Sequence, residues 1–317
     1  MKTAKQSYKY IFGPVNSRRL GRSLGIDLIP YKTCSFDCVY CECGKTTKHT
    51  LERKEFFPLD EIKDELKQYL SLAPELDYIT FSGSGEPLLY LKFGELAGFL
   101  KTEFPQYKTA LLTNSSLFIN EKARAECLKC DITLPSLDAG DDETFNKINR
   151  PCCGIKVSDI IEGLINFRNE FSGKIYLEIF IIPGINDSEE KLLKIKEAVF
   201  RIRPDEIQLN SLDRPGTEDD IVSADYEKLK EILEYMDYPG RIISRAKAPE
   251  KITPKNYYNI KRIILDTTLR RPLTMEDLMS ITGEKEDNLI ESVRLLEEKG
   301  FVFKKEANGK IFYVRKV

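Results

Sequence analysis

The chain has 317 residues, of which 41% are hydrophobic and 32% are charged, a composition typical of a soluble protein with one large and one small domain. Its 49 lysines and arginines nearly balance its 51 aspartates and glutamates, which excludes a protein that binds polyanions through its overall charge. No run of about 18 apolar residues and no apolar signal segment occurs, so we expect a cytoplasmic protein that does not span a membrane.

The N-terminal segment, residues 1–23, carries basic residues and no acidic ones. These are Lys2, Lys5, Lys9, Arg18, Arg19 and Arg22. Such a local excess of positive charge can contact a nucleic-acid backbone, and the alternative is a solvated basic tail.

From residue 24 to residue 245, short apolar runs alternate with segments of helical period, the pattern of βα units around a parallel sheet. The expected strands are 24–29, 77–82, 108–113, 131–136, 174–181, 205–210 and a short one at 241–244. The expected helices are 59–72, 93–103, 121–130, 157–169, 189–203 and 226–235. We therefore expect the chemistry on loops after the carboxyl ends of the strands.

The loop after the first strand carries Cys34, Cys38 and Cys41, spaced C-x3-C-x2-C. Three thiolates suit an iron-sulfur cluster and leave one iron open to another ligand. With Cys43, the same cysteines could instead form a zinc site, although structural zinc sites usually pair two separated C-x2-C-like knuckles. Disulfides are disfavoured in a protein that we expect in the cytoplasm.

The loops after the next strands carry glycine and small polar residues. Glycines in the loop Ser82, Gly83, Ser84, Gly85, Glu86 allow the backbone to approach a ligand closely, and the alternative is a plain tight turn. Thr113 and Asn114 end the third strand, and Ser136 and Asp138 follow the fourth, where they could bind a ligand or cap the next helix.

This combination of motifs resembles the radical S-adenosylmethionine (SAM) enzymes. The resemblance implies an α/β fold, a partial (β/α)6 barrel similar to a TIM barrel, and a [4Fe-4S] cluster on Cys34, Cys38 and Cys41. It also implies that the open iron chelates SAM. An electron from a reductant such as flavodoxin or ferredoxin would then cleave SAM to a 5′-deoxyadenosyl radical, which would abstract a hydrogen from the substrate. The cofactor-binding residues that it implies are Tyr40, Ser82, Gly83, Ser84, Gly85, Glu86, Thr113, Asn114, Ser136, Asp138, Ile182 and Asn210.

Further segments resemble the group of radical SAM proteins related to the core of 4-demethylwyosine synthase, a tRNA-modifying enzyme. They are residues 13–22, 136–140, 148–151, 208–210 and 214–216, so that the resemblance covers about residues 8–216. The chain departs from that enzyme because it has no cysteine before Cys34, and no lysine can be assigned to bind pyruvate. The resemblance therefore does not carry over that substrate.

Four other cysteines, Cys127, Cys130, Cys152 and Cys153, follow no family pattern. An auxiliary iron-sulfur cluster is one interpretation. Buried thiols packed in a core and a reactive thiol facing the substrate are the alternatives.

The last part of the chain predicts a second domain. Residues 246–255 carry two prolines and no periodicity, as a linker does. Helices are expected at 257–266, 274–281 and 286–299, and the Asn308-Gly309 pair predicts a hairpin over 301–314. This order predicts a winged-helix domain over residues 256–317.

Charge on this predicted domain differs between its third helix and its hairpin. The helix has a net charge of about minus three, which disfavours insertion into a DNA groove. The hairpin and its end carry Lys304, Lys305, Lys310, Arg315 and Lys316 against Glu306. A basic hairpin could bind an RNA backbone, and the alternative is a structural or dimerising domain.

Three substrate classes therefore stay open: a nucleotide of tRNA or another RNA, a peptide or protein docked on the winged helix, and a small metabolite. A non-enzymatic iron-sulfur sensor is disfavoured because it would not need the loop that carries Gly85, Glu86 and Pro87. Sequence does not identify the product, the electron donor or the oligomeric state.

Overall fold

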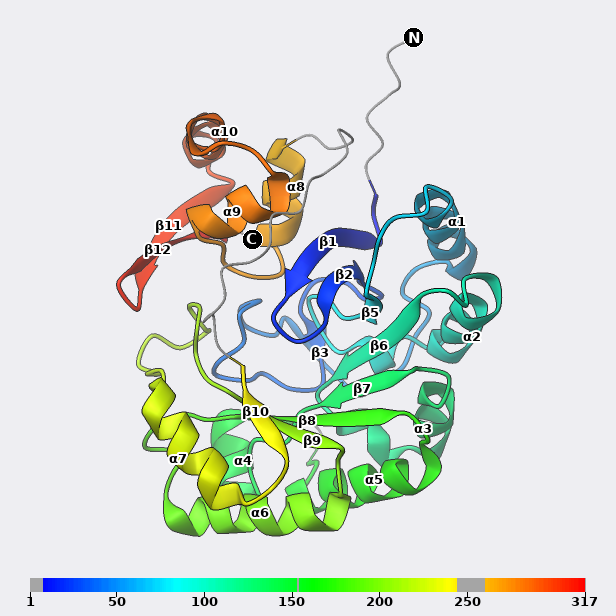
Figure 1. Cartoon of the computed structure of the whole chain (residues 1–317), viewed down its shortest axis with the longest axis vertical. Coiled ribbons are helices and arrows are strands. Elements are labelled where there is room, and N and C mark those ends of the chain that lie inside the picture. Colours follow the sequence, from blue (N-terminus) through cyan, green and yellow to red (C-terminus); the bar gives the residue numbers. More distant parts are fainter. Residues whose placement is uncertain (1–7, 153, 244–259, 317) are drawn as a thin grey trace.

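The protein is described by a computed structural model that covers residues 8–152, 154–243 and 260–316. Its centre is an eight-stranded sheet in the order β1-β2-β5-β6-β7-β8-β9-β10 (Figure 1). β1 pairs antiparallel with β2, and every other neighbouring pair in this sheet is parallel. This mostly parallel sheet is consistent with the partial barrel that the sequence predicts.

Six parallel strands lead into helices, as the sequence predicts. The strands are β2 Gly21–Ile26, β5 Tyr78–Phe81, β6 Lys108–Thr113, β7 Ile132–Pro135, β8 Lys174–Phe180 and β9 Glu206–Asn210. The helices are α1 Leu59–Leu70, α2 Phe93–Glu103, α3 Glu121–Cys127, α5 Val157–Glu170, α6 Glu189–Ile202 and α7 Tyr226–Met236. β10, Gly240–Ile242, adds a last parallel strand.

The sequence analysis did not predict several short elements. They are the strands β3 Thr33–Cys34 and β4 Lys48–His49, the helix α4 Asp142–Ile148, and the 3-10 turns η1 Pro87–Leu89 and η2 Ser116–Ile119. Each is too short to develop a clear hydrophobic period.

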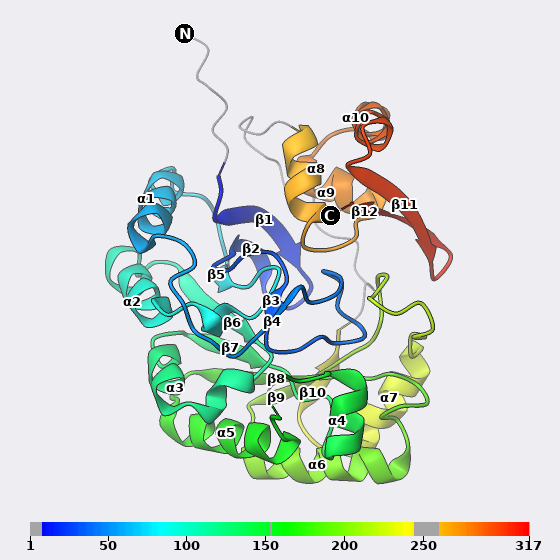
Figure 2. The ribbon, with the colours of Figure 1, turned by 180° about the vertical axis from the view of Figure 1, so that it is seen from behind.

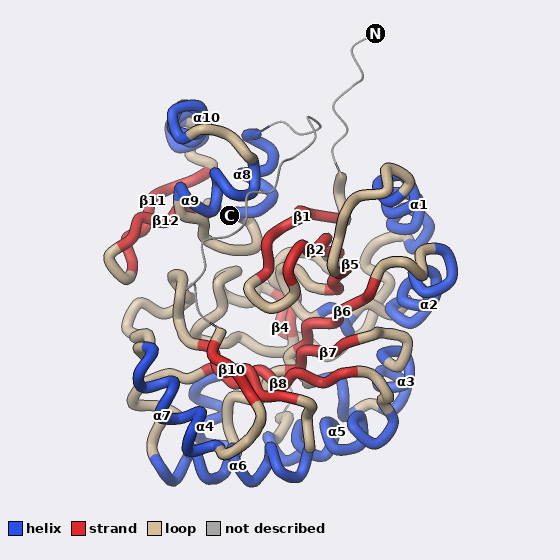
Figure 3. The backbone as a smooth tube through the Cα atoms, in the orientation of Figure 1, coloured by secondary structure: helices blue, strands red, loops and turns tan. Residues whose placement is uncertain are grey.

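The helices cover the outside of the curved sheet (Figure 3). Apolar strand residues such as Leu24, Ile79 and Leu111 are fully buried, and they share one large core with helix residues such as Ile62 and Leu164. Burial of this apolar surface holds the helices on the outer face and leaves the carboxyl ends of the strands to the loops.

The N-terminal segment is part of the sheet, which the sequence analysis did not expect. β1, Ile11–Ser17, pairs with β2, and the arginines after it form ion pairs. Arg18 binds Asp213 at 3.1 Å, Arg19 binds Glu178, and Arg22 binds Glu75 at 2.8 Å. A solvated tail is therefore wrong for residues 8–23, whereas Lys2 and Lys5 lie outside the described residues.

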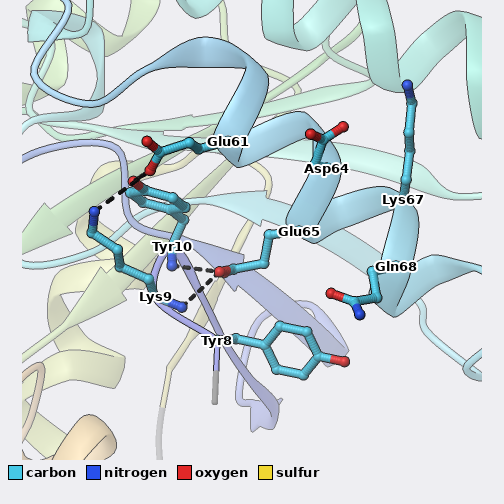
Figure 4. Close-up of a pocket in the computed structure, with 8 residues that line it drawn as sticks. All are labelled: Tyr8, Lys9, Tyr10, Glu61, Asp64, Glu65, Lys67 and Gln68. Carbon is cyan, nitrogen blue, oxygen red and sulfur yellow. Dashed lines mark hydrogen bonds and ion pairs between the residues drawn. The ribbon is translucent and has the colours of Figure 1, made fainter. Parts of the chain in front are cut away.

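The start of this segment is tied to α1 beside a surface pocket of about 700 Å³ (Figure 4). Glu65 accepts hydrogen bonds from the backbone nitrogens of Lys9, Tyr10 and Ile11 at 2.7–2.8 Å. The pocket is lined by residues 8–10 and by α1, with no residue from the loops after the strands. It therefore belongs to the anchoring of the N-terminus and not to the predicted site.

The C-terminal part has the predicted three helices and hairpin. They are α8 Ile260–Thr268, α9 Met275–Thr282, α10 Glu286–Glu298, β11 Val302–Ala307 and β12 Lys310–Arg315. Asn308 and Gly309 both have positive φ, as a tight hairpin turn requires. A separate core that includes Ile264, Leu278 and Leu289 holds these elements together, whereas the predicted linker at 246–255 lies outside the described residues.

This C-terminal part spans the two edges of the central sheet (Figure 1). On the β1 side, Asn16 donates to the Ser280 hydroxyl at 3.3 Å. On the other side, the hairpin contacts the loop after β9, where Lys305 pairs with Asp219 at 2.6 Å and Asn308 donates to the Leu212 carbonyl at 3.3 Å. It thus bridges the ends of an open sheet. Among the helices described, none is long and apolar enough to cross a membrane.

Candidate iron-sulfur and cofactor site

The three predicted cluster cysteines lie in a loop that main-chain hydrogen bonds fix from several sides. β3 pairs with β4 beside Cys34, and the Thr50 amide donates to the Cys34 carbonyl at 3.0 Å. The Cys41 amide donates to the Cys38 carbonyl at 3.1 Å, and the Val39 amide donates to the Ile148 carbonyl at 2.9 Å. These bonds fix the main chain of the cysteine loop, which runs between β2 and α1 (Figure 2).

Each of the three sulfurs has a side-chain nitrogen donor near it. Asn114 Nδ2 lies 3.5 Å from Cys34 Sγ, and Asn149 Nδ2 lies 3.5 Å from Cys38 Sγ. Lys32 Nζ lies 3.0 Å from Cys41 Sγ. Electron-rich sulfur ligands accept such hydrogen bonds, which also tune a cluster's reduction potential. This arrangement fits a cluster held by three thiolates.

Cys43 is engaged elsewhere and is a poor candidate for a fourth ligand. Its Sγ donates to the Arg270 carbonyl at 2.8 Å, in the connection between α8 and α9. Within the described ranges, no three or more cysteine, histidine, aspartate or glutamate side chains are arranged to hold one metal ion. A cubane does not need that arrangement, because each of its thiolates binds a different iron.

Charges in the loop favour thiolate at one cysteine. The neighbouring Cys43 and the Lys32 ammonium lower the pKa of Cys41 to about 5, although its burial acts in the opposite direction. Burial alone would lower the pKa of Lys32, but Cys41 and Cys43 raise it. Lys32 is only 2% exposed, so this ammonium is held against the loop inside the protein.

The two glycines of the Ser82–Glu86 loop are required by its close packing. A Cβ on Gly83 would lie 2.2 Å from Asp27 Oδ1, and one on Gly85 would lie 2.0 Å from the Thr33 carbonyl oxygen. Ser84 donates its backbone nitrogen and hydroxyl to Asp27, at 3.3 and 3.2 Å to Oδ2. The glycines therefore serve contacts within the protein, and the close approach of a ligand to this loop stays a prediction.

Glu86 is 1% exposed and uses its carboxylate to join two strand ends. Oε1 accepts from the Leu88 amide at 3.0 Å and from Thr113 Oγ1 at 2.8 Å, and Oε2 accepts from the Asn114 amide at 2.8 Å. Burial raises the pKa of Glu86 to about 7, although these hydrogen bonds oppose the rise. Glu86 thus places Asn114, whose amide group faces Cys34.

Asp138 has a similar role at the end of β7. Its carboxylate accepts from the Tyr40 hydroxyl at 2.6 Å, from Asn149 Nδ2 at 2.7 Å and from the Phe180 amide at 2.9 Å. Tyr40 also stacks on the Phe180 ring with centroids 3.9 Å apart. Burial raises the pKa of Asp138 to about 6. Asp138 therefore fixes the aromatic residue between Cys38 and Cys41.

The other predicted cofactor residues lie at the same edge of the sheet. Asn210 ends β9 and donates to Glu178 Oε1 at 2.8 Å. Ser136 forms a bridge with Glu178, and Ile182 is buried in a small cluster with Val39 and Phe180. The Ser82 amide donates to the Ile26 carbonyl at 3.2 Å.

A capping contact explains one of the polar residues after β6 and β7. Asn114 Oδ1 accepts from the Ser116 amide at 3.0 Å at the start of η2, so the capping alternative holds in part for Asn114. The side chain of Asp141 caps α4, so the capping alternative is wrong for Asp138.

Several residues of this site were missed by the sequence analysis. Asp27 directly follows β2, so the strand-end rule could have found it. Lys32 and Asn149 lie in loops whose sequence has no distinctive pattern. Arg270, in the α8–α9 connection, binds Asp27 although the two residues are 243 positions apart along the chain. Only tertiary structure reveals that contact.

Of the four remaining cysteines, the three that the structure describes do not gather in one place. Cys127 and Cys130 belong to the main hydrophobic core, and Cys127 Sγ donates to the Ala123 carbonyl at 3.1 Å. The Cys152 amide donates to the Ser35 carbonyl at 3.0 Å, close to the cysteine loop. Cys153 lies outside the described residues. Cys127 and Cys130 thus match the interpretation as buried thiols.

A family model described as the radical SAM superfamily matches residues 28–195. A UPF0026 protein of Methanocaldococcus jannaschii is 31% identical over 314 residues, covering 96% of both chains. A protein of Brachyspira hyodysenteriae named GTPase Obg is 35% identical over 316 residues, but this chain spans only 46% of its length. A more distant relative is a putative glycyl-radical enzyme activating enzyme of M. jannaschii, 28% identical over 170 residues, which covers 52% of this chain and 59% of its own. Another is the Staphylococcus aureus ribosomal RNA large subunit methyltransferase Cfr, 26% identical over 161 residues, which covers 50% of this chain and 44% of its own.

Solved structures share the fold at low sequence identity. A radical SAM methyltransferase from Sphaerobacter thermophilus aligns over 69% of this chain and 66% of its own, with a TM-score of 0.52 and 17% identity. Streptococcus suis SuiB bound to S-adenosylmethionine aligns over 73% of this chain and 52% of its own, with a TM-score of 0.51 and 16% identity.

Proposed function

Since the chain belongs to the radical SAM superfamily and, within it, to the UPF0026 proteins, we propose that it generates a 5′-deoxyadenosyl radical to modify a nucleotide in tRNA or another RNA. It is an enzyme of this superfamily, whose cofactors are a [4Fe-4S] cluster and SAM. When bound, the cluster supplies the electron that cleaves SAM.

We assign the cluster to Cys34, Cys38 and Cys41. The nitrogen donors at 3.5, 3.5 and 3.0 Å from these sulfurs support the assignment. Asn114, Asn149 and Lys32 would orient the thiolates and stabilise their negative charge. The protein contributes position and exclusion of water here, and the cofactors carry the difficult chemistry.

SAM would lie at the carboxyl ends of the strands, against the residues that the family resemblance names. Main-chain atoms of Ser82–Glu86 and the polar groups of Thr113, Asn114, Ser136 and Asn210 are placed there. Glu86 and Asp138 would act indirectly, because their carboxylates already accept three hydrogen bonds each within the protein. Tyr40 and Ile182 would supply apolar contacts.

The similarity to Cfr carries the proposal of an RNA substrate, since that relative is named for action on ribosomal RNA. The C-terminal helices and hairpin fit a winged helix, a fold that often binds nucleic acid. Two of its lysines are already paired, Lys304 with Glu297 at 3.2 Å and Lys305 with Asp219 at 2.6 Å. Arg18, Arg19 and Arg22 are paired as well. Lys310 is therefore a better candidate for phosphate contacts than the sequence alone suggested.

A protein substrate is the second candidate, because another relative is named as an activating enzyme of glycyl-radical enzymes. A small metabolite is the third. The GTPase activity in the name of the Brachyspira relative is not proposed here, because the sequence lacks a G-x4-G-K-S/T phosphate loop.

SAM cleavage is tested by anaerobic reconstitution with iron and sulfide, reduction with dithionite, and chromatography for 5′-deoxyadenosine. Failure to form this product, or equal product after Cys34, Cys38 and Cys41 are replaced by alanine, would refute the radical chemistry.

The substrate is tested by mass spectrometry of tRNA nucleosides from a deletion strain. A missing modified nucleoside would identify substrate and reaction together. RNA that is unchanged in the deletion strain, and no RNA retained by the purified protein, would favour the peptide or metabolite alternatives.

A further inference from the structure

A group of arginines lies between the cysteine loop and the C-terminal part of the chain, and no cofactor role assigned above uses it. Arg214 follows β9, Arg271 lies in the connection between α8 and α9, and Arg18 follows β1. Arg214 lies 3.5 Å from Glu42, the residue after Cys41, and the charges of Arg18 and Arg271 also act on Glu42. Burial alone would raise the pKa of Glu42, but Arg214, Arg18 and Arg271 lower it.

Arg214 is deeply buried and incompletely paired. Its side chain is 4% exposed, and its ion pairs are long, at 3.5 Å to Glu42, 3.4 Å to Asp277 and 3.8 Å to Asp213. Charge-assisted hydrogen bonds are usually about 2.7–2.9 Å. Its buried Nε has no hydrogen-bond partner in the structure. This guanidinium therefore has donor capacity left.

Arg271 has more. Over the described ranges, no side-chain hydrogen bond or ion pair of Arg271 occurs, although a guanidinium carries five N–H donors. Burial and the neighbouring Arg214 lower its pKa to about 10, although Asp277 and Glu42 are also near. The adjacent carboxylates are already shared, because Asp213 also binds Arg18 at 3.1 Å, and both Asp213 and Asp277 have further partners.

We propose that Arg271 and Arg214 bind an anionic group, a carboxylate or phosphate, of a small molecule beside the cysteine loop. Two guanidiniums with unused donors in a poorly solvated place are stabilised by an anion that accepts from both. Arg214 lies at the carboxyl edge of the sheet and Arg271 comes from the C-terminal part, so the site is complete only when that part is docked.

The position favours a small anion over the backbone of an RNA. Arg214 is 4% exposed, and α8 and α9 pack against β1 on the same side as Arg271. A polymer phosphate could reach these side chains only if the C-terminal part moved away. The inference does not depend on the identity of the molecule that the radical attacks, because the anion is bound as a separate small molecule beside the cysteine loop.

The test is calorimetry on the anaerobically reconstituted protein with inorganic phosphate and with acetate, at constant ionic strength against chloride. We expect saturable binding of at least one of them to the wild type, weakened about tenfold or more in Arg271→Gln. Arg271→Lys should keep part of the affinity because it keeps the charge. Arg262→Gln, on the exposed face of α8, is the matched control and should bind as the wild type does.

Three outcomes would overturn this inference: no saturable binding of either anion, equal binding by Arg271→Gln, or loss of SAM binding in place of anion binding. RNA binding that depends on Arg271 while free phosphate and acetate do not bind would also overturn it. Formation of 5′-deoxyadenosine by the wild type is measured separately. Product without anion binding would refute only this inference, and anion binding without product would refute only the proposed function.

Discussion

Glu86 should make the stability of this protein depend on pH in a way that Glu86→Gln removes. The carboxyl is 1% exposed, and its pKa rises from 4.5 in the unfolded chain to about 7 in the folded one. A raised pKa means that the folded chain binds this proton more tightly than the unfolded chain does. Its contribution to stability is therefore fully present below about pH 4.5 and is lost as the pH rises through about 7.

The size of the effect follows from the shift. The difference between 4.5 and about 7, at about 1.4 kcal/mol for each pH unit, gives about 3 kcal/mol. Glutamine does not titrate, so the variant should lack this slope. The glutamine side chain also presents an amide N–H to the Asn114 amide, where the wild type offers a carboxylate oxygen near pH 8. This mismatch should lower the free energy of unfolding of the variant by about 1–3 kcal/mol at that pH.

The assay is urea unfolding of the wild type and Glu86→Gln at several values between about pH 5 and pH 8. The wild type should lose about 3 kcal/mol more than the variant across this range. Glu103→Gln, on the exposed end of α2, is the control and should keep the wild-type slope. Parallel profiles for wild type and Glu86→Gln would refute the reasoning.

The remaining predictions concern the cluster loop and the docking of the C-terminal part. Replacing Cys34, Cys38 or Cys41 by alanine should remove bound iron and the visible absorbance of the cluster, whereas Cys43→Ala should keep both; iron retained by the first three variants would contradict the assignment. Arg270→Ala should lower the free energy of unfolding by about 3 kcal/mol, because it leaves the buried Asp27 without its partner at 3.0 Å. Adding Asp27→Asn should recover part of that loss in the same urea assay, and additive losses would argue against the pair. Gly85→Ala should weaken SAM binding measured by calorimetry, because its Cβ would lie 2.0 Å from the Thr33 carbonyl oxygen; unchanged binding would mean that the loop can shift.

The sequence predicted the repeating part of the fold well, because hydrophobic period and length act locally. β6 and α2 have the predicted bounds, and α6 differs by one residue. β1 was missed because its sequence mixes glycine, proline and polar residues, and its place at the edge of the sheet comes from pairing with β2. The basic charge of this segment suggested a tail, whereas ion pairs with distant acidic residues decide its structure.

The site was predictable where one motif carries the chemistry. Cys34, Cys38 and Cys41 share a loop, and Glu86, Asn114 and Asp138 follow strands whose ends meet. What each carboxylate does was not predictable, because the partners of Asp138 come from three separate segments around residues 40, 149 and 180. Nothing local to Arg214 or Arg271 indicated that they would lie beside Glu42.

The docking of the α8–α9 connection on the cysteine loop sets an order of events during synthesis. Cys43 and Arg270 are 227 residues apart, so at about 5–20 residues per second the ribosome needs on the order of 10–45 s to add the second after the first. During that interval the cysteine loop has already been made, while the segment that covers it has not. If the cluster is held as proposed, iron and sulfide can reach the nascent loop before Arg270 is made, and the finished protein would carry its cluster beside a segment that was translated later.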